Sequence, residues 1–307
     1  MGAPVSLVRV PSARSRAEGA IRLALVVAAL LSVATTVAIV GSLLFETIEF
    51  FREIPPQDFL FGTKWSPTFA GEQASFGVLP LLWGTVYLSL IALVVAVPLG
   101  LLCAIYLSEY ARPRVRRTVK PALELLAGVP TIVFGYFALT FFTPSILQGA
   151  GIDVGVYNAL AAGLVMGLLV LPTIASVAED AMSAVPQSLR EGAFGLGANK
   201  LQVSLRIVFP AALSGIVAAL MLGASRAIGE TVLILVAAGQ SPNLGLDPRE
   251  SYQSMASFIA SIARGDIPTG SIEYKTIFAV GFTLFVATLI LNLLSIRLVR
   301  RYRQVYE

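Results

Sequence analysis

Six apolar stretches, separated by clusters of charged residues, dominate this sequence. Each is about 20 residues or longer, the length that a helix needs to cross the hydrocarbon core of a bilayer. They run over Leu23–Phe45, Leu79–Leu107, Leu125–Leu147, Val154–Ala178, Ile207–Ala238 and Thr276–Ile296. The sequence therefore predicts an all-α polytopic membrane protein with six transmembrane helices.

The composition excludes several other classes of protein. Of 307 residues, 56% are hydrophobic and only 13% are charged, and the mean hydropathy is +0.82, whereas soluble domains carry about 25% charged residues. The chain has no histidine and one cysteine, Cys103, so we expect no metal site, no bound cofactor and no intrachain disulfide. We attribute the net charge of +4 to loops at the membrane surface, and expect contact with lipid rather than nucleic acid.

The distribution of lysine and arginine predicts the orientation, because these residues are enriched in cytoplasmic loops. Sixteen of them lie in the N-terminal tail, the 108–120 loop, the 179–206 loop and the C-terminal tail, against five in the three opposite loops. Both termini are therefore predicted to be cytoplasmic.

The resulting layout is a cytoplasmic tail over 1–22, a first transmembrane helix over 23–45, and an outer loop over 46–78. A core with five more helices follows over 79–299 and includes the cytoplasmic loop 179–206, and a second cytoplasmic tail covers 300–307. The first helix is predicted to be retained, because its uncharged run of 23 residues is longer than the core of a secretory signal. The outer loops 46–78 and 239–275 are too short for independent domains.

The 179–206 loop is longer than a connection between two helices requires. Pro186 is predicted to start a helix, and small residues over 193–198 allow a tight bend. Leu201, Leu205 and Val208 follow at helical spacing and predict a short apolar face. Such a segment would present a knob to a partner at the membrane surface.

Two charged residues interrupt the fifth apolar stretch, Arg226 and, one turn later, Glu230. An arginine in the bilayer costs at least about 2.5–3.5 kcal/mol, so it should face protein or a water-filled path, and its fork of donors suits a tetrahedral oxyanion. Glu230 could instead simply neutralise Arg226 across one turn, or could both hold the guanidinium and face the path. Ser225 and Thr231 are candidate hydroxyl donors.

Glu124 lies near the cytoplasmic mouth of the third stretch. It is a candidate lining residue of an inner gate, although a carboxylate that reaches the surface would be unremarkable there. Gly128 and Pro130 predict a kink or break close by.

One motif within the 179–206 loop and the residues after it resembles the "EAA" loop of ABC-importer permeases. The matching residues are Glu191, Gly192, Ala193, Gly197, Ile207, Phe209 and Pro210; Gly192 replaces an alanine and Phe209 a leucine of the motif. The resemblance implies a coupling helix that inserts into a separate ATPase subunit, where ATP and Mg²⁺ would bind. The chain itself has no phosphate-binding P-loop, so it is expected to be a transport subunit and not an enzyme.

Further segments resemble the phosphate-specific ABC permeases of the PstC and PstA family, and most closely the PstC type. They cover 76–85, 124–137, 226–231, 265–281 and 300–307. The resemblance implies the type I ABC importer (MetI-like) permease fold in a bacterial or archaeal cytoplasmic membrane. It also implies a second, PstA-like permease, two PstB-like ATPase subunits and an external PstS-like phosphate-binding protein. Phosphate would then pass inward by alternating access.

Three other readings remain open at this point. The substrate could be another oxyanion such as sulfate, molybdate or phosphonate, since one arginine does not distinguish tetrahedral anions. A proton-coupled secondary transporter could use Glu124, Arg226 and Glu230 as a relay, although the loop motif argues against it. A sensor role that reports phosphate status is a possible second function.

Overall fold

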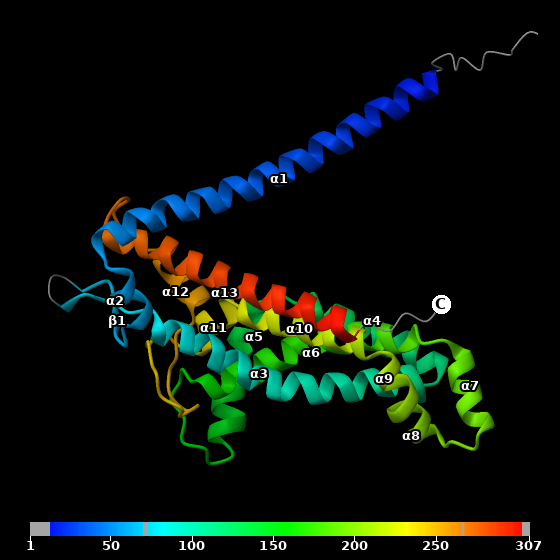
Figure 1. Ribbon diagram of the computed structural model, residues 1–307. Coiled ribbons are helices and arrows are strands. Elements are labelled where there is room, and N and C mark those ends of the chain that lie inside the picture. Colours follow the sequence, from blue (N-terminus) through cyan, green and yellow to red (C-terminus); the bar gives the residue numbers. More distant parts are fainter. Residues whose placement is uncertain (1–12, 70–72, 266, 303–307) are drawn as a thin grey trace, which may run out of the picture.

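The computed structural model describes residues 13–69, 73–265 and 267–302, and these fold into a bundle of helices with one small hairpin (Figure 1). Five helical segments are long and apolar enough to cross a membrane: Ala17–Glu53, Leu79–Tyr110, Thr131–Gln148, Ala159–Ser183 and Ile272–Val299. The helices that form them are α1 (Ala13–Glu53), α3 (Leu79–Ile105) with the π-helical η2 (Tyr106–Tyr110), α5 (Thr131–Phe137) with the π-helical η3 (Ala138–Gln148), α6 (Ala159–Ser183) and α13 (Ile272–Tyr302).

The fifth predicted span, Ile207–Ala238, is not one straight helix. Its segments are α8 (Lys200–Val203), the π-helical η4 (Ser204–Val208), α9 (Phe209–Ala211), α10 (Leu213–Ile228) and α11 (Val232–Ala237). The chain bends by 73° between Lys200–Ala211 and Leu213–Ile228, and a sixth crossing exists only if this bent pair counts as one span. A second break at Gly229–Thr231 separates α10 from α11.

The third predicted span also starts later than expected. Helix α4 (Pro113–Ala127) ends just before Gly128, and Pro130 caps the start of α5. The break that Gly128 and Pro130 predicted is therefore present, and it separates a basic amphipathic helix from the apolar one.

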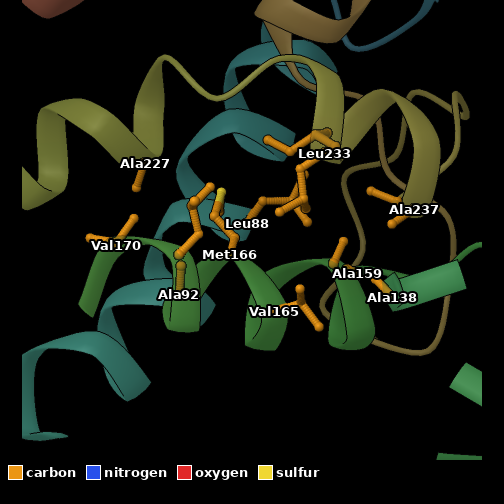
Figure 2. Close-up of a cluster of buried hydrophobic side chains, with 14 of the residues drawn as sticks. Leu88, Ala92, Ala138, Ala159, Val165, Met166, Val170, Ala227, Leu233 and Ala237 are labelled. Carbon is orange, nitrogen blue, oxygen red and sulfur yellow. The ribbon is translucent and has the colours of Figure 1, made fainter. Parts of the chain in front are cut away.

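Helices α3 and α6 form the centre of the bundle through small residues. A Cβ atom on Gly167 would lie 2.8 Å from the carbonyl oxygen of Ala92, and one on Gly163 would lie 2.5 Å from Ile91 Cγ2. Such close approach of backbones is how helices associate where no water drives them together. Figure 2 shows that the surrounding core draws side chains from several helices, among them Leu88 of α3, Met166 of α6, Ala227 of α10 and Leu233 of α11.

The two ends of the bundle differ. At one end lie α2 (Pro56–Phe61), the antiparallel pair β1 (Trp65–Ser66) and β2 (Ser75–Phe76), and α12 (Met255–Ile262); we call this the β1 end. Edge-to-face aromatic contacts among Phe50, Phe59 and Trp65 hold it together. At the opposite end, the α7 end, lie α7 (Gln187–Gly195) and α8, and the described part of the chain starts and finishes towards this side (Figure 1).

Helix α1 stands apart from the other helices over most of its length (Figure 1). Every residue from Ala17 to Ile39 is exposed, and burial begins only at Thr47 and Phe50. Phe50 packs in an apolar cluster with Ala279 and Val280 of α13. The helix is therefore attached to the bundle at the β1 end alone.

Candidate translocation and coupling sites

Arg226 lies in the last turn of α10 and is half-buried. Its Nη1 donates to Thr173 Oγ1 of α6 at 2.8 Å, and its Nη2 donates to the carbonyl oxygen of Ala127, the last residue of α4, at 3.2 Å. A cation is favoured at the carboxyl ends of α10 and α4, because the carbonyl end of a helix carries a partial negative charge. Arginine has more N–H donors than these two contacts use, so the guanidinium keeps donors for a ligand.

Glu230 does not pair with Arg226, so the predicted neutralisation across one turn is wrong. Gly229 ends α10, and the chain turns before α11 begins. The Glu230 side chain is buried, and its Oε1 accepts a hydrogen bond from the backbone N–H of Leu233 at 3.2 Å. A carboxylate at a helix N-terminus satisfies a free N–H and opposes the partial positive charge there. Glu230 thus holds the break between α10 and α11 in place.

The two candidate hydroxyl groups have hydrogen-bond partners within the chain. Ser225 Oγ contacts Asn292 Oδ1 of α13 at 3.4 Å, and Thr231 Oγ1 donates to the carbonyl oxygen of Gly229 at 3.1 Å. Ser225 therefore faces α13, whereas Arg226 faces α4 and α6. The structure does not bring these two side chains to a common point.

Glu124 is exposed near the end of α4 and lines a cavity of about 560 Å³ at the α7 end. The lining also includes Ser108, Arg116, Arg117 and Lys120, so the cavity is polar and rich in cations. Arg226 does not line it. The cavity and the Arg226 contact lie next to each other along α4, because Ala127, which accepts a hydrogen bond from Arg226, comes three residues after Glu124.

A buried carboxylate, Glu179, joins α4 to α6 at this end. The sequence predicts a loop that starts at Glu179, but α6 continues to Ser183 and Glu179 is fully buried. It forms ion pairs with Arg116 and, at 2.7 Å, with Lys120, and accepts a hydrogen bond from Ser183 Oγ at 2.8 Å. Burial disfavours the charged form of Lys120, but its hydrogen bonds to Asp180 and Glu179 outweigh that cost and raise the pKa of Lys120 above its usual value.

The predicted helix–bend–helix of the 179–206 loop is present in the structure. Pro186 precedes α7, and α7 ends in a turn at Gly197, where φ is +84°. The N–H of Gly197 donates to the carbonyl of Phe194 at 2.9 Å, which closes the helix. Asn199 then caps α8 by accepting from the N–H of Gln202, whose side chain accepts in return from the N–H of Asn199.

The motif residues lie at different places on α7 and on the segment that follows it. Glu191 and Gly192 are exposed on α7, Gly197 is exposed in the turn after it, and Pro210 is exposed in α9. Ala193 packs against the bundle, and Ile207 is partly buried. Of the predicted apolar face, only Val208 is buried, whereas Leu201 and Leu205 are exposed. Leu196, at the tip, is 92% exposed. The tip thus presents apolar and acidic groups outward.

Several residues of these sites are not predicted by the sequence patterns. Thr173 and the Ala127 carbonyl carry no local signal, since they meet Arg226 only through the packing of α4, α6 and α10. Glu179 could have been predicted from the sequence. It directly follows an apolar stretch, and the 108–120 loop, which is predicted to lie on the same side of the membrane, is rich in basic residues. The cap formed by Asn199 and Gln202 also follows a recognised sequence pattern.

Five helices of the described residues, or six if the bent pair is one span, are long and apolar enough to cross a membrane, which defines a helical multi-pass membrane protein. The family model described as "binding-protein-dependent transport system inner membrane component" matches residues 96–304. The chain belongs to this family. It is a multi-pass membrane protein and a permease subunit of an ABC importer, a machine that works with ATPase subunits and a substrate-binding protein.

Comparison with individual proteins shows which members of this family the chain resembles. The chain is 32% identical over 275 residues to a probable ABC transporter permease protein, YqgH, of Bacillus subtilis, covering 89% of this chain and 88% of that one. It is 32% identical to the phosphate transport system permease protein PstC of Haemophilus influenzae, covering 80% and 82%. It is 36% identical to PstC 1 of Mycobacterium tuberculosis, covering 74% and 73%. The predicted resemblance to PstC-type permeases is confirmed.

Solved structures confirm the predicted fold. A bacterial alginate ABC transporter, in complex with an alginate pentasaccharide-bound periplasmic protein, matches with a TM-score of 0.64 at 18% identity, over 92% of this chain and 96% of that one. The inward-facing MetNI methionine ABC transporter matches with a TM-score of 0.54 at 19% identity, over 74% and 95%. The architecture is therefore that of type I ABC importer permeases.

Proposed function

We propose that this chain is the permease subunit of an importer that carries inorganic phosphate into the cell by alternating access. The observation that supports it most directly is Arg226, a half-buried guanidinium at the α10–α11 break that retains unused donors. Several relatives named as phosphate permeases support the choice of phosphate among the tetrahedral oxyanions. Arginine recognises such oxyanions through paired N–H donors.

In this proposal the α7 end is cytoplasmic and the β1 end is external. Basic residues are concentrated in the loops and tails of the α7 end, as expected of a cytoplasmic surface. The knob of α7 and α8 enters a groove on a separate ATPase subunit, with Glu191 placed to pair with a basic partner residue and Gly197 providing the turn. A second permease, two ATPase subunits that bind ATP and Mg²⁺, and an external phosphate-binding protein complete the importer.

Transport by this subunit needs no covalent chemistry. ATP-driven closure of the ATPase pair favours one arrangement of the helices, and phosphate binds the two arrangements with different affinity. In the outward-facing arrangement phosphate reaches Arg226 from the β1 end. In the inward-facing arrangement it leaves past Glu124 and the cationic cavity at the α7 end.

The test is uptake of labelled phosphate into proteoliposomes that contain this chain with its partner permease and ATPase, with the binding protein outside. Uptake that requires ATP and persists in excess sulfate and molybdate is the expected result. Suppression by either competitor would reassign the substrate to another oxyanion, the second candidate, because Arg226 suits any tetrahedral anion. Uptake without ATP would overturn the mechanism.

A further inference from the structure

An ion pair between two residues far apart in the sequence attaches the 179–206 loop to η2, at the end of α3. Arg190 of α7 donates from Nη2 to Glu109 Oε1 of η2 at 3.0 Å, across 81 positions of the chain. The Arg190 side chain is 11% exposed and that of Glu109 is 7% exposed. Exposed ion pairs contribute little, but a nearly buried pair leaves an uncompensated charge when one partner is removed.

Arg190 also holds the connection that leads into α7. Its Nη2 donates to the carbonyl oxygen of Met182 in α6 at 2.8 Å, and its Nη1 donates to the carbonyl of Val185 in the linker. One guanidinium therefore joins the end of α6, the linker, α7 and η2. A displacement of α7 cannot leave η2 behind without breaking this set of contacts.

A second contact reaches the same short element from the other helix of the loop. Lys200 Nζ, at the start of α8, lies 5.0 Å from the centre of the Tyr110 ring, and Tyr110 follows Glu109 directly. Cations within about 6 Å of an aromatic face are attracted to it. Both helices of the loop thus hold neighbouring residues of η2 through a cation.

The element that they hold is a π-helical turn. Residues 106–110 continue α3 with wider turns, and α3 runs from there to the β1 end. Single π-helical turns within helices are frequent at functional sites. A push on η2 is therefore passed along the axis of the helix that packs most closely on α6, at the centre of the bundle.

We propose that η2 receives the movement of the 179–206 loop, and that Arg190 and Glu109 are the positioning residues that convert ATPase movement into movement of α3. This inference rests on the proposed ATP-driven import but not on the identity of the substrate. Lys200 and Tyr110 form a second, weaker link to the same element.

The experiment measures ATP hydrolysis and substrate uptake in the same proteoliposomes, with the full complex and the binding protein. Arg190→Gln and Glu109→Gln should leave the ATPase bound and active while substrate moved per ATP falls by about fivefold or more, a typical size for coupling between sites. The exchange of both charges, Glu109→Arg with Arg190→Glu, should recover part of that ratio. Arg206→Gln is the matched control, because Arg206 is an exposed arginine of the same loop.

A second pair of variants covers the case in which changes at Arg190 prevent assembly. Tyr110 is 40% exposed, so Tyr110→Leu should fold and lower the ratio, whereas Tyr110→Phe keeps the ring and should preserve it. An unchanged ratio in all of these variants, or an equal loss of hydrolysis and uptake, would overturn the role of η2. Failure of the proposed function is distinguishable, since the unmodified complex would then show no ATP-dependent uptake.

Discussion

The guanidinium of Arg226 lies 3.2 Å from the carbonyl oxygen of Ala127, a residue 99 positions earlier in the chain. Ala127 ends α4 just before the break at Gly128, and Arg226 precedes the break at Gly229. Two interruptions of helices thus meet at one cation. Irregular backbone is tolerated in a membrane where it is enclosed by protein or lines a cavity, so this meeting point is where a change of helix orientation can be accommodated.

Replacing Arg226 should impair uptake more than replacing its partner. Arg226→Gln should lower uptake by about ten- to a hundredfold, since hydrogen bonds to a charged group contribute about 1.5–3 kcal/mol each. Arg226→Lys keeps the charge but loses the paired N–H donors of the guanidinium, so its uptake should lie between that of Arg226→Gln and that of the unmodified protein. Uptake in proteoliposomes checks this, with Thr173→Val as the control that removes only the positioning contact. Normal uptake by Arg226→Gln would remove the residue from the path.

Gly197→Ala should weaken attachment of the ATPase. Its φ of +84° lies in the left-handed region, where a side chain costs about 1–2 kcal/mol, although a Cβ atom there would meet nothing within 4 Å. Gly195→Ala is the matched control, because a Cβ atom there also meets nothing but no positive φ is required. Co-purification of ATPase with each variant measures the difference; equal retention by both would mean that the turn does not shape the contact. Gly197→Trp, which adds bulk at the exposed turn, should dissociate or uncouple the ATPase altogether.

Glu179→Ala should destabilise the α7 end. The Glu179 carboxylate is fully buried and is shared by Arg116 and Lys120, so its removal leaves both cations without their common partner and opens a void in the packing. Asp180→Asn is the control: Asp180 pairs with the same Lys120 but its side chain is 61% exposed, so the change should cost at most about 1 kcal/mol. Thermal unfolding in detergent should rank the two variants in this order. A smaller effect for Glu179→Ala than for Asp180→Asn would contradict the role of burial.

Asp247, in the segment between α11 and α12, should titrate well below an ordinary aspartate. Hydrogen bonds from the Arg249 side chain and backbone N–H lower the pKa of Asp247 from 3.8 to about 2. Because the folded state has the lower pKa, this pair stabilises it above pH 3.8 and loses that effect as the pH falls through about 2. The chain has five aspartates, so carboxyl ¹³C resonances of labelled aspartate can follow the titration. Arg249→Gln should return the midpoint towards 3.8, and an unshifted midpoint would exclude Arg249 as the cause.

The hydropathy pattern predicted most of the helices because each helix that crosses a membrane must itself be apolar, whichever helices it packs against. The helix after Pro186, the bend around Gly197 and the break at Gly128 and Pro130 were also readable, since proline and glycine act on their own backbone. These features need no knowledge of which helices touch.

The contacts of Arg226 were not readable for the opposite reason. Pairing with Glu230 assumed one continuous helix, in which residues four apart share a face. Gly229 ends that helix, and Glu230 then serves α11 instead. The true partner groups, Thr173 and the Ala127 carbonyl, depend on which helices pack together. The packing of helices against one another cannot be predicted from one sequence by these patterns.

Helix α1 meets the rest of the chain at one end only, and this separates two stages of assembly. From Ala17 to Ile39 its residues are all exposed, so the insertion of this part depends on transfer from water to lipid and on hydrogen bonds within the helix. It can therefore enter the membrane before any other helix is made. Because α1 is one continuous helix, the packing of its last turns then sets the direction in which the exposed part extends. The remaining helices acquire their arrangement afterwards, with Phe50 as the point at which the first helix joins them.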